Sequence, residues 1–288
     1  MHSSGRTIIL IAGRYQAKIV SVGAGIAELT HCGRHLVIAH KPEEMPLAHM
    51  GKVLVPWPNR VADGRYEHDG KVFNLPVNDP VSHSAIHGLL AWRDWQVCDQ
   101  CANSVTLSVF LPPSYGYPFA LVCNVIYRLD ADTGLSASII TRNIGDKPAP
   151  YGAGAHPYLT CNLEKIDGCT LTMPATDLFS VDTLQPVANA LDFSTTREIG
   201  STQIDHTFKA RTAPAPWEVR ITSIQQAMTT WLRTSQPWLQ IYTGDKLQRL
   251  GLAIEPMSCP PNAFNSGVDL FFLAPEETHN LAFSIGCD

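Results

Sequence analysis

Apolar and polar side chains alternate with a period of two over several stretches of the chain. Between positions 104 and 111 every second residue is apolar, and these residues are Val105, Leu107, Val109 and Leu111. The same alternation occurs at 135–139 and 217–222, and we expect it to continue through 238–242. Because successive side chains of a strand point to opposite faces, this pattern predicts half-buried strands. No comparably clear pattern for a long amphipathic helix accompanies it.

Turn-forming residues are spread along the whole chain. The sequence has 21 prolines and 20 glycines, which punctuate many short segments, as at 112–118, and do not gather in one linker. We find no internal repeat and no composition shift that marks a domain boundary. Short strands with frequent turns predict an all-β fold, a large antiparallel β-sandwich, with residues 1–288 forming a single domain.

Composition narrows the function. Hydrophobic residues make up 45% of the 288 residues and charged residues 16%, which describes a globular protein with a sizeable core. The formal net charge of −5, from 21 basic and 26 acidic residues, gives no sign of a basic face for nucleic acid or an anionic membrane. We therefore expect small-molecule chemistry.

Eight cysteines and one short apolar run bear on the compartment. Disulfide frameworks belong to small secreted chains, so in a chain of this size we expect reduced thiols. The run at 8–12 is too short for a signal-peptide core, no stretch reaches membrane-spanning length, and we expect a cytoplasmic protein. Cys98 and Cys101 have C-x-x-C spacing, but without a second pair we interpret them as two thiols near a strand end, not as metal ligands.

Glu255 is the first residue that suggests catalysis. It follows the apolar run 252–254 and precedes Pro256, a pattern that places it at the end of a strand. Most glutamates are solvated on the surface, and that is the ordinary interpretation here too. The apolar run favours burial instead, which would raise the pKa of the carboxyl group towards that of a general base.

Two histidines lie in turn-like settings. His87 precedes a glycine and is close to Trp92, and His156 lies between a glycine-rich segment and Pro157. Trp92 could pack on the apolar face of a sugar ring or fill the core. For either histidine alone, a structural role is the commoner one. Together with a carboxylate, however, imidazoles can deliver and remove one proton in a single site.

Three further polar residues suggest ligand binding. Asn59 and Arg60 end a segment stiffened by two prolines, where an amide and a guanidinium suit the recognition of hydroxyls or anions. Asp205 is flanked by apolar residues and could accept hydrogen bonds from sugar hydroxyls, or cap a turn. None of these signals is specific alone.

Taken in order, six short segments resemble the aldose 1-epimerase, or galactose mutarotase, family. They are Pro-Trp-Pro-Asn-Arg-Val at 56–61, Gly-Arg-Tyr at 64–66, Ile-His-Gly at 86–88, His-Pro-Tyr at 156–158, Ile-Asp-His-Thr-Phe at 204–208 and Glu-Pro at 255–256. The resemblance extends over nearly the whole chain. It implies a large antiparallel β-sandwich that interconverts the α and β anomers of a free sugar without a metal or organic cofactor.

The resemblance also implies a role for each matching residue. Glu255 would be the base that takes the proton of the anomeric hydroxyl, and His156 would protonate the ring oxygen. His87 would hydrogen-bond sugar oxygens near C1, Arg60 would orient the substrate, and Asp205 would bind its hydroxyls. The two opposite proton roles require a pair of residues.

Two segments narrow the resemblance and suggest a substrate. Residues 86–95 and 255–264 look closest to a bacterial subgroup that includes the mutarotase of sulfoquinovose breakdown. The chain departs from many members at Leu89, in place of a glycine, and at Met257, in place of a glutamine, which puts galactose and glucose in doubt as substrates. Of the cations near the motifs, Arg93, Lys246 and Arg249, we name Arg93 as the candidate to bind the sulfonate.

Two alternatives stay open at this point. The chain could be a non-catalytic carbohydrate-binding or regulatory protein on the same fold, because a fold does not secure an activity. It could also be a hexose-6-phosphate 1-epimerase, which would need a more basic pocket than the net charge suggests. The sequence gives no oligomeric state.

Overall fold

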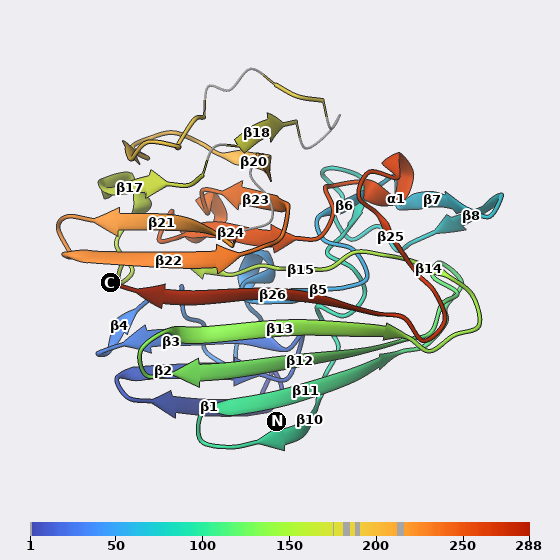
Figure 1. The fold of residues 1–288 in the computed structure, drawn as a ribbon, viewed down its shortest axis with the longest axis horizontal. Coiled ribbons are helices and arrows are strands. Elements are labelled where there is room, and N and C mark those ends of the chain that lie inside the picture. The colour runs from blue at the N-terminus through green and yellow to red at the C-terminus, as the bar shows by residue number, and fades with distance from the viewer. Residues whose placement is uncertain (1, 175, 181–184, 188–190, 212–215) are drawn as a thin grey trace.

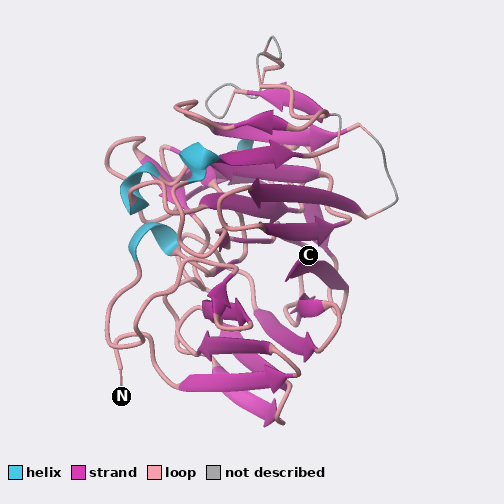
Figure 2. Cartoon of the chain, turned by 90° about the vertical axis from the view of Figure 1, so that its left-hand side faces the viewer, coloured by secondary structure: helices cyan, strands magenta, loops and turns pink. Residues whose placement is uncertain are grey.

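Strands dominate the protein, and its helices are short (Figure 2). The computed structural model describes residues 2–174, 176–180, 185–187, 191–211 and 216–288. Within these residues the helical elements are one short α-helix and three 3₁₀ turns: α1 (Ala263–Ser266), η1 (Leu47–His49), η2 (Ile166–Gly168) and η3 (Asp245–Leu247). This agrees with the absence of a clear helical pattern in the sequence.

The largest element is a nine-stranded antiparallel sheet, which crosses the centre of Figure 1. Its strands in spatial order are β10 (Gln96–Gln100), β11 (Ser104–Leu111), β12 (Leu121–Asp130), β13 (Gly134–Asn143), β26 (Thr278–Cys287), β22 (Met228–Thr234), β21 (Trp217–Ser223), β17 (Cys169–Thr172) and β19 (Arg197–Glu198). The C-terminal strand β26 therefore joins two parts of the sheet that are distant in sequence.

A second antiparallel sheet has seven strands. Its strands are β18 (Thr176–Phe179), β20 (Asp205–Ala210), β23 (Trp238–Tyr242), β24 (Leu252–Met257), β15 (Gly154–Ala155) and β5 (Val53–Leu54), with β16 (Tyr158–Leu159) also paired to β24. The two sheets meet just after β16. There the thiol of Cys161 lies 3.6 Å from the carbonyl oxygens of Ile221 and Met228, in β21 and β22.

The remaining strands form smaller sheets. A four-stranded sheet consists of β1 (Thr7–Ala12), β2 (Tyr15–Val20), β3 (Gly25–His31) and β4 (Arg34–His35), and its first two strands lie against β11 and β12. Three two-stranded sheets pair β6 (Arg60–Ala62) with β9 (Ser84–Ile86), β7 (Arg65–His68) with β8 (Lys71–Asn74), and β14 (Ala149–Tyr151) with β25 (Phe271–Leu273). The expected antiparallel β-sandwich is confirmed.

The period-two pattern is confirmed in three strands. Burial alternates along β11, β13 and β21, where apolar side chains such as Val105 and Ile221 are buried and the intervening polar ones are more exposed. The prediction is wrong for β23. Its residues 238–241 are all buried, because the strand lies in the interior of the seven-stranded sheet and protein covers both of its faces.

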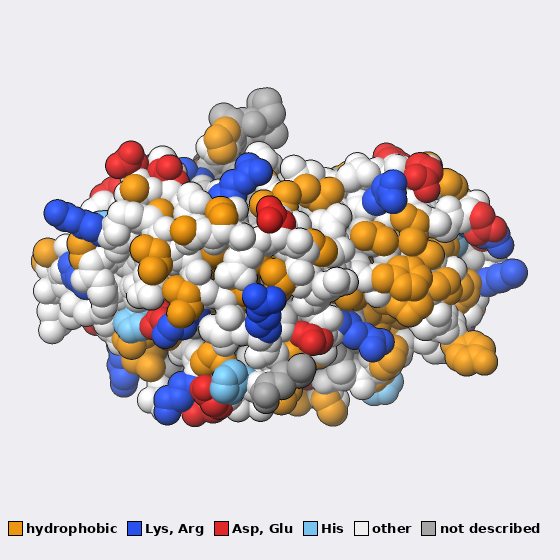
Figure 3. Space-filling model, turned by 90° about the horizontal axis from the view of Figure 1, so that it is seen from below, with side chains coloured by type: hydrophobic (Ala, Val, Ile, Leu, Met, Phe, Trp, Pro, Cys, Tyr) orange, Lys and Arg blue, Asp and Glu red, His pale blue; other side chains and the backbone are white. Residues whose placement is uncertain are grey.

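The apolar run at 8–12 lies in strand β1, where Ile9 and Ile11 are exposed. No helix of the described residues is long and apolar enough to span a membrane. All eight cysteines are free thiols, as expected, and the exposed Cys98 and Cys101 lie in the middle of β10 and directly after its last residue. Acidic and basic side chains are interspersed over the face seen in Figure 3.

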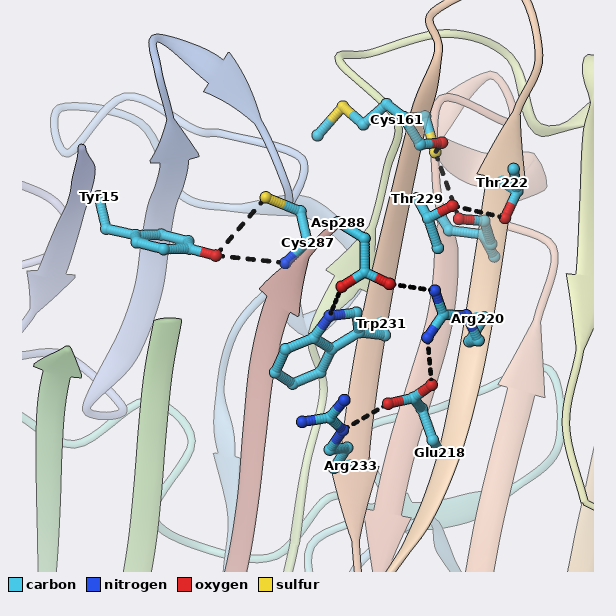
Figure 4. A network of polar contacts seen from close by, with 12 residues as sticks. Tyr15, Cys161, Glu218, Arg220, Thr222, Thr229, Trp231, Arg233, Cys287 and Asp288 are labelled. Atoms are coloured by element: carbon cyan, nitrogen blue, oxygen red, sulfur yellow. Dashed lines mark hydrogen bonds and ion pairs between the residues drawn. The ribbon is translucent and has the colours of Figure 1, made fainter. Parts of the chain in front are cut away.

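Partly exposed ion pairs fasten the end of β26 to its neighbours (Figure 4). The carboxylate of Asp288 accepts hydrogen bonds from the guanidinium of Arg220 and, at 3.3 Å, from the indole of Trp231. Glu218 in turn accepts from Arg220 at 2.5 Å and from Arg233. We refer to Asp288, Arg220, Glu218 and Arg233 as the β21–β26 ion network.

Candidate active site

Strand register places four polar side chains in one row across the seven-stranded sheet. Thr207 of β20 pairs with Gln240 of β23, which pairs with Glu255 of β24. On the other side of β24, the paired positions are Gly154 with Met257 and Tyr158 with Ala253. His156 lies midway between Gly154 and Tyr158, and Glu255 lies midway between Ala253 and Met257. The antiparallel register therefore brings His156 opposite Glu255. Residues in one row share a face, so the sheet aligns these side chains.

Glu255 and His156 form a buried acid–base pair. Oε1 of Glu255 lies 3.3 Å from Nε2 of His156, and the two residues are only 2% and 5% exposed. Two contacts orient the imidazole: its ring stacks on Tyr158 with the centroids 5.0 Å apart, and its backbone N–H donates to the carbonyl of Lys52 at 3.0 Å. The pair therefore sits in a fixed geometry.

The expectation that Glu255 ends a strand at Pro256 is wrong. Strand β24 continues to Met257, and every one of its residues is buried. Pro256 is paired with Leu239 inside the sheet. The fixed φ of proline is compatible with extended backbone, so the strand loses one N–H donor but keeps its direction. Glu255 consequently projects from the middle of a rigid strand.

Burial disfavours the charged form of both groups. It raises the pKa of Glu255 well above the usual value, and the negative charge of Asp205 adds to the shift. It lowers the pKa of His156 to about 3, with a smaller contribution from His49. Burial thus disfavours the ion pair of a carboxylate and an imidazolium and favours the neutral form of both groups. One proton is shared by two groups in contact.

His87 reaches the same place from the loop after β9. Its backbone lies in the left-handed region at φ 62°, and its N–H donates to the carbonyl of Asn59 at 2.7 Å. The next residue must be Gly88, because a Cβ there would lie 2.2 Å from the carbonyl oxygen of Val55. Burial lowers the pKa of His87, and the charges of His49, His156 and Arg60 lower it further.

Asn59 and Arg60 are positioned by the small sheet that β6 and β9 form. Arg60 pairs with Ile86, the residue before His87, and Asn59 is buried with its backbone at φ 51°. The loop and the strand that carry these residues are therefore tied directly to the loop that carries His87. The two segments, separated by about 25 positions in sequence, present an amide, a guanidinium and an imidazole together.

Asp205 is connected to the row by Gln240. The amide nitrogen of Gln240 donates to Oδ1 of Asp205 at 2.6 Å, and its oxygen accepts from the hydroxyl of Thr207 at 2.6 Å. Asp205 is exposed to the cavity, whose walls shield it from bulk water and raise its pKa, while Gln240 and the charge of Arg60 oppose that shift. The carboxylate is thus fixed at one oxygen.

These side chains line one cavity of about 260 Å³. The lining residues are Ala48, His49, Asn59, Arg60, Asp79, Ile86, His87, His156, Tyr158, Asp205, Gln240, Tyr242, Lys246 and Glu255. Six of the eight site residues predicted from sequence are among them. Pockets for drug-sized ligands occupy roughly 300–1,000 Å³, so this cavity suits a single small ring.

Trp92 and Arg93 are not brought to the cavity wall. Trp92 is 39% exposed and donates from its indole N–H to Nε2 of His49 at 3.3 Å, and Arg93 is exposed. Arg249 is also engaged elsewhere, by Asp167 at 3.0 Å. Lys246 is the cation near these motifs that lines the cavity, together with Arg60. The spacing of these residues along the sequence did not show which of the cations line the cavity and which lie outside it.

Several lining residues escaped the sequence prediction. Gln240 carries the clearest signal, because it is a buried polar residue within the apolar strand Trp238–Tyr242. His49 comes from η1 and Asp79 from a loop, and neither belongs to a motif. The two departures from the family pattern, Leu89 and Met257, do not line the cavity: Leu89 packs against the core, and Met257 is buried beside Trp238.

A metal ion is one ligand that this side-chain set could accept. His87, His156 and Glu255 each place one ligand atom within 4.8 Å of the other two, all from buried residues. Two imidazoles and a carboxylate form a common zinc ligand set. The expectation of no metal and no cofactor therefore stays a prediction that requires a chelation experiment.

Comparisons with known proteins identify the family. The family model for aldose 1-epimerase matches residues 6–286. The uncharacterized protein YihR of Escherichia coli K12 is 56% identical over 292 residues, which cover 99% of this chain and 94% of YihR. The aldose 1-epimerase of the same organism is 26% identical, over 69% of this chain and 64% of that protein. The crystal structure of the GalM/aldose epimerase homologue from Caenorhabditis elegans superposes with a TM-score of 0.85 and 20% identity, covering 98% of each chain.

The protein belongs to the aldose 1-epimerase family. It is an enzyme of the isomerase class that acts on a small-molecule sugar, and its fold is the galactose mutarotase-like sandwich of its structural neighbours. The family resemblance noted in the sequence is confirmed.

Proposed function

We propose that this protein interconverts the α and β anomers of a free aldohexose by opening and reclosing the sugar ring. The observation that carries the proposal is the buried Glu255–His156 pair, with its two polar atoms 3.3 Å apart on the wall of a cavity sized for one ring. Ring opening needs a proton acceptor at the anomeric hydroxyl and a proton donor at the ring oxygen. A carboxyl group and an imidazole that share one proton can serve both needs.

The reaction starts when the shared proton moves from Glu255 to His156 across their contact. Glu255, now a carboxylate, takes the proton of the O1 hydroxyl, and His156 gives its proton to the ring oxygen O5. The C1–O5 bond breaks, which leaves an aldehyde at C1 and a hydroxyl at C5. The aldehyde end rotates, and the reverse proton transfers close the ring as the other anomer.

The remaining lining residues orient the sugar. Arg60 and Asn59 offer donors, Asp205 offers an acceptor oxygen, and His87 offers an imidazole next to the pair. Hydrogen bonds hold the segments that carry these residues, since β6 pairs with β9 and Asp205 is bonded to Gln240. These fixed positions limit movement of the substrate. Fixed substrate geometry can supply a large part of the rate acceleration, because orientation is settled before the bond breaks.

Sulfoquinovose is our leading substrate. The similarity of segments 86–95 and 255–264 to the sulfoquinovose mutarotase subgroup supports it, and Lys246 and Arg60 supply two cations at the cavity that suit a sulfonate. The acidic neighbours Asp79 and Asp205 argue against a more highly charged phosphate. We assign the sulfonate to Lys246 in preference to Arg93, which is exposed outside the cavity wall.

We also propose that residues 1–288 form one domain and that the protein works in the cytoplasm. The match of one family model to residues 6–286 supports the first statement, and eight free thiols support a reducing compartment. Limited proteolysis that releases no stable fragment, and cell fractionation with an epitope tag, test the two statements.

The experiment is magnetisation-exchange NMR of the anomeric protons of sulfoquinovose, glucose, galactose and glucose 6-phosphate, each with purified protein. We expect exchange to accelerate most for sulfoquinovose, to survive EDTA, and to disappear in the Glu255→Gln variant. Binding without exchange on any sugar would establish the non-catalytic alternative. Exchange confined to glucose 6-phosphate would establish the hexose-6-phosphate epimerase, and loss of exchange in EDTA would establish a metal enzyme.

A further inference from the structure

His49 is a cavity residue to which neither the sequence motifs nor the mechanism assigns a task. It lies at the end of η1, and its imidazole centroid is 4.6 Å from that of His87 and 6.5 Å from that of His156. It lines the same cavity as the Glu255–His156 pair. A third imidazole at this position would touch a bound sugar.

The backbone that presents His49 is held in an unfavourable conformation. Ala48 and His49 both lie in the left-handed region, at φ 50° and 52°. Residues other than glycine adopt it rarely, and it persists where surrounding contacts enforce it, often at functional sites. Here the N–H of Lys52 donates to the carbonyl of His49 at 3.0 Å, and the hydroxyl of Tyr158 donates to that of Ala48 at 3.4 Å.

Trp92 determines which ring nitrogen of His49 carries hydrogen. Its indole N–H lies 3.3 Å from Nε2 of His49. An indole nitrogen is a donor only, so Nε2 must be the acceptor. The neutral imidazole then has its hydrogen on Nδ1, which can donate it to a ligand. The contact thus selects one of two tautomers.

Lys52 contacts the ring of Trp92, the residue that orients His49. It is fully buried, its ammonium donates to the carbonyl of Val22 at 2.6 Å, and it lies 5.2 Å from the centre of the Trp92 ring. A cation over the face of an indole is attracted to it. The carbonyl of Lys52 also accepts the N–H of His156. One residue therefore braces both Trp92 and the catalytic histidine.

The charges around His49 favour its neutral form. Burial lowers its pKa to about 4, and the cations Lys52 and Lys246 contribute, against the opposing charge of Asp79. Burial lowers the pKa of Lys52 to about 8, so the lysine is mainly cationic at pH 7. The neighbouring imidazoles of His87 and His156 carry no negative charge that would stabilise a protonated His49. The imidazole consequently stays neutral over the physiological range.

We propose that His49 is a substrate-binding residue that donates a hydrogen bond from Nδ1–H to an oxygen of the sugar, and that Trp92 and Lys52 are positioning residues for it. The proposal deepens the proposed function and rests on it for the identity of the ligand. It gives Trp92 a task different from the sugar platform expected from sequence. It also gives the buried lysine a task.

The binding test compares two substitutions of His49 by isothermal titration calorimetry with glucose, galactose and sulfoquinovose. His49→Phe keeps an aromatic ring without a donor, and we expect at least a tenfold rise in the Kd of the tightest sugar. His49→Asn places an amide near the position of Nδ1 on a residue that tolerates the left-handed backbone, and we expect it to recover most of the affinity. Wild-type affinity in His49→Phe would overturn the proposal.

The positioning test observes the tautomer directly by ¹⁵N NMR of the histidine rings. In the wild-type protein we expect His49 to show the Nδ1–H tautomer and no titration between pH 5.5 and 8. Trp92→Phe keeps the ring but not the N–H, so we expect mixed tautomers and a three- to tenfold rise in KM with little change in kcat. If Trp92→Phe misfolds, Lys52→Met serves in its place, where we expect a rise in the pKa of His49. An Nε2–H tautomer in the wild-type protein contradicts the proposal.

These tests separate this proposal from the proposed function. Absence of anomer exchange by the wild-type protein would refute the mutarotase but leave the calorimetric and ¹⁵N results to decide the role of His49. Normal exchange together with unaltered sugar binding in His49→Phe would refute the role of His49 and leave the mutarotase standing.

Discussion

The β21–β26 ion network and the Glu255–His156 pair both combine a carboxylate with a nitrogen base, yet their surroundings differ. Asp288 and Glu218 face guanidinium groups in a partly exposed network next to strands β21, β22 and β26 (Figure 4), and the hydrogen bond from Arg220 lowers the pKa of Asp288. Glu255 faces an imidazole and is itself buried, and burial raises its pKa. Contact with a guanidinium thus favours the ionised form of Asp288, whereas burial disfavours that of Glu255.

The difference shows what a site needs in order to move a proton. A permanent cation such as arginine fixes the charge of its partner, whereas histidine can accept or release a proton in the same range as a buried carboxyl group. Contact between an acid and a base is common on protein surfaces. Burial distinguishes the Glu255–His156 pair, whose two residues are almost fully enclosed.

The largest effect is expected when the imidazole is removed from the pair. In His156→Asn the ring oxygen loses its proton donor, so we expect kcat to fall by about 10²- to 10⁴-fold while sugar affinity changes little. Magnetisation-exchange NMR measures the rate, and calorimetry measures the affinity. A variant that exchanges anomers at close to the wild-type rate would assign the donor to another residue, with His87 the nearest candidate.

The next effect concerns stability against pH. The folded-state pKa of Glu255 is raised above the ordinary value of 4.5, so its contribution to stability is present below about pH 4.5 and is lost as the pH rises through the folded pKa. Glu255→Gln cannot ionise, and we expect it to exceed the wild-type free energy of unfolding by at least about 1 kcal/mol at pH 8, and by less at pH 5. Urea denaturation at both pH values checks this, and a difference that does not vary with pH would contradict it.

The buried histidines determine how the free energy of unfolding changes at acidic pH. The pKa values of His156 and His49 are lowered, to about 3 and about 4, from an ordinary 6.5. Their contribution is therefore present above about pH 6.5 and is lost progressively as the pH falls from there to the folded values of about 4 and about 3, because in that range the unfolded chain binds protons that the folded chain does not. This loss should be the same in wild-type protein and Glu255→Gln, which makes it an internal control.

A smaller effect is expected from Gln240→Leu, which removes the connection between the row and Asp205. The leucine leaves the carboxylate of Asp205 without its fixed donor, so we expect KM to rise about tenfold and kcat to change less than threefold. Thr207→Val removes the hydrogen bond at the other end of Gln240 and should have a smaller effect. A fall in kcat with unchanged KM would instead place Gln240 in the chemical step.

The smallest effect is expected in the ion network. Arg220→Gln removes a partly exposed cation, and we expect the free energy of unfolding to fall by less than about 1 kcal/mol, with a smaller loss at high salt. Anomer exchange should be unchanged, because the network lies outside the cavity wall. A large loss of activity would show that strands β21, β22 and β26 of the nine-stranded sheet are coupled to the site.

Much of the fold was predictable because the sandwich faces impose a period of two. Val105 and Ile221 reveal their burial through the pattern of their neighbours, since each strand has one wetter face. Strand β23 lost this signal, because both of its faces are covered. The continuation of β24 through Pro256 was also hidden, since proline usually marks a strand edge.

The cavity was predictable where a residue lies in a short motif that turns and prolines make conspicuous, as for Arg60, His87 and His156. It was not predictable for His49, which lies in the short turn η1 outside the motifs. Lys246 was one of three candidate cations, and its position in the sequence did not show that it lines the cavity. Arg93 shows the converse error. It lies six residues from His87 in sequence, but the turn after Gly88 directs it to the surface.

The row of Thr207, Gln240, Glu255 and His156 across the seven-stranded sheet restricts which changes of sequence length the protein can tolerate. Inserting one residue into β24 ahead of Glu255 would rotate the carboxylate to the opposite face, because side chains alternate along a strand. The loops that bring Asp79 and Lys246 to the cavity carry no such restriction. Lineages that descend from this scaffold are therefore expected to accumulate insertions and deletions in those loops, changing which sugars they accept, while the strand lengths stay constant.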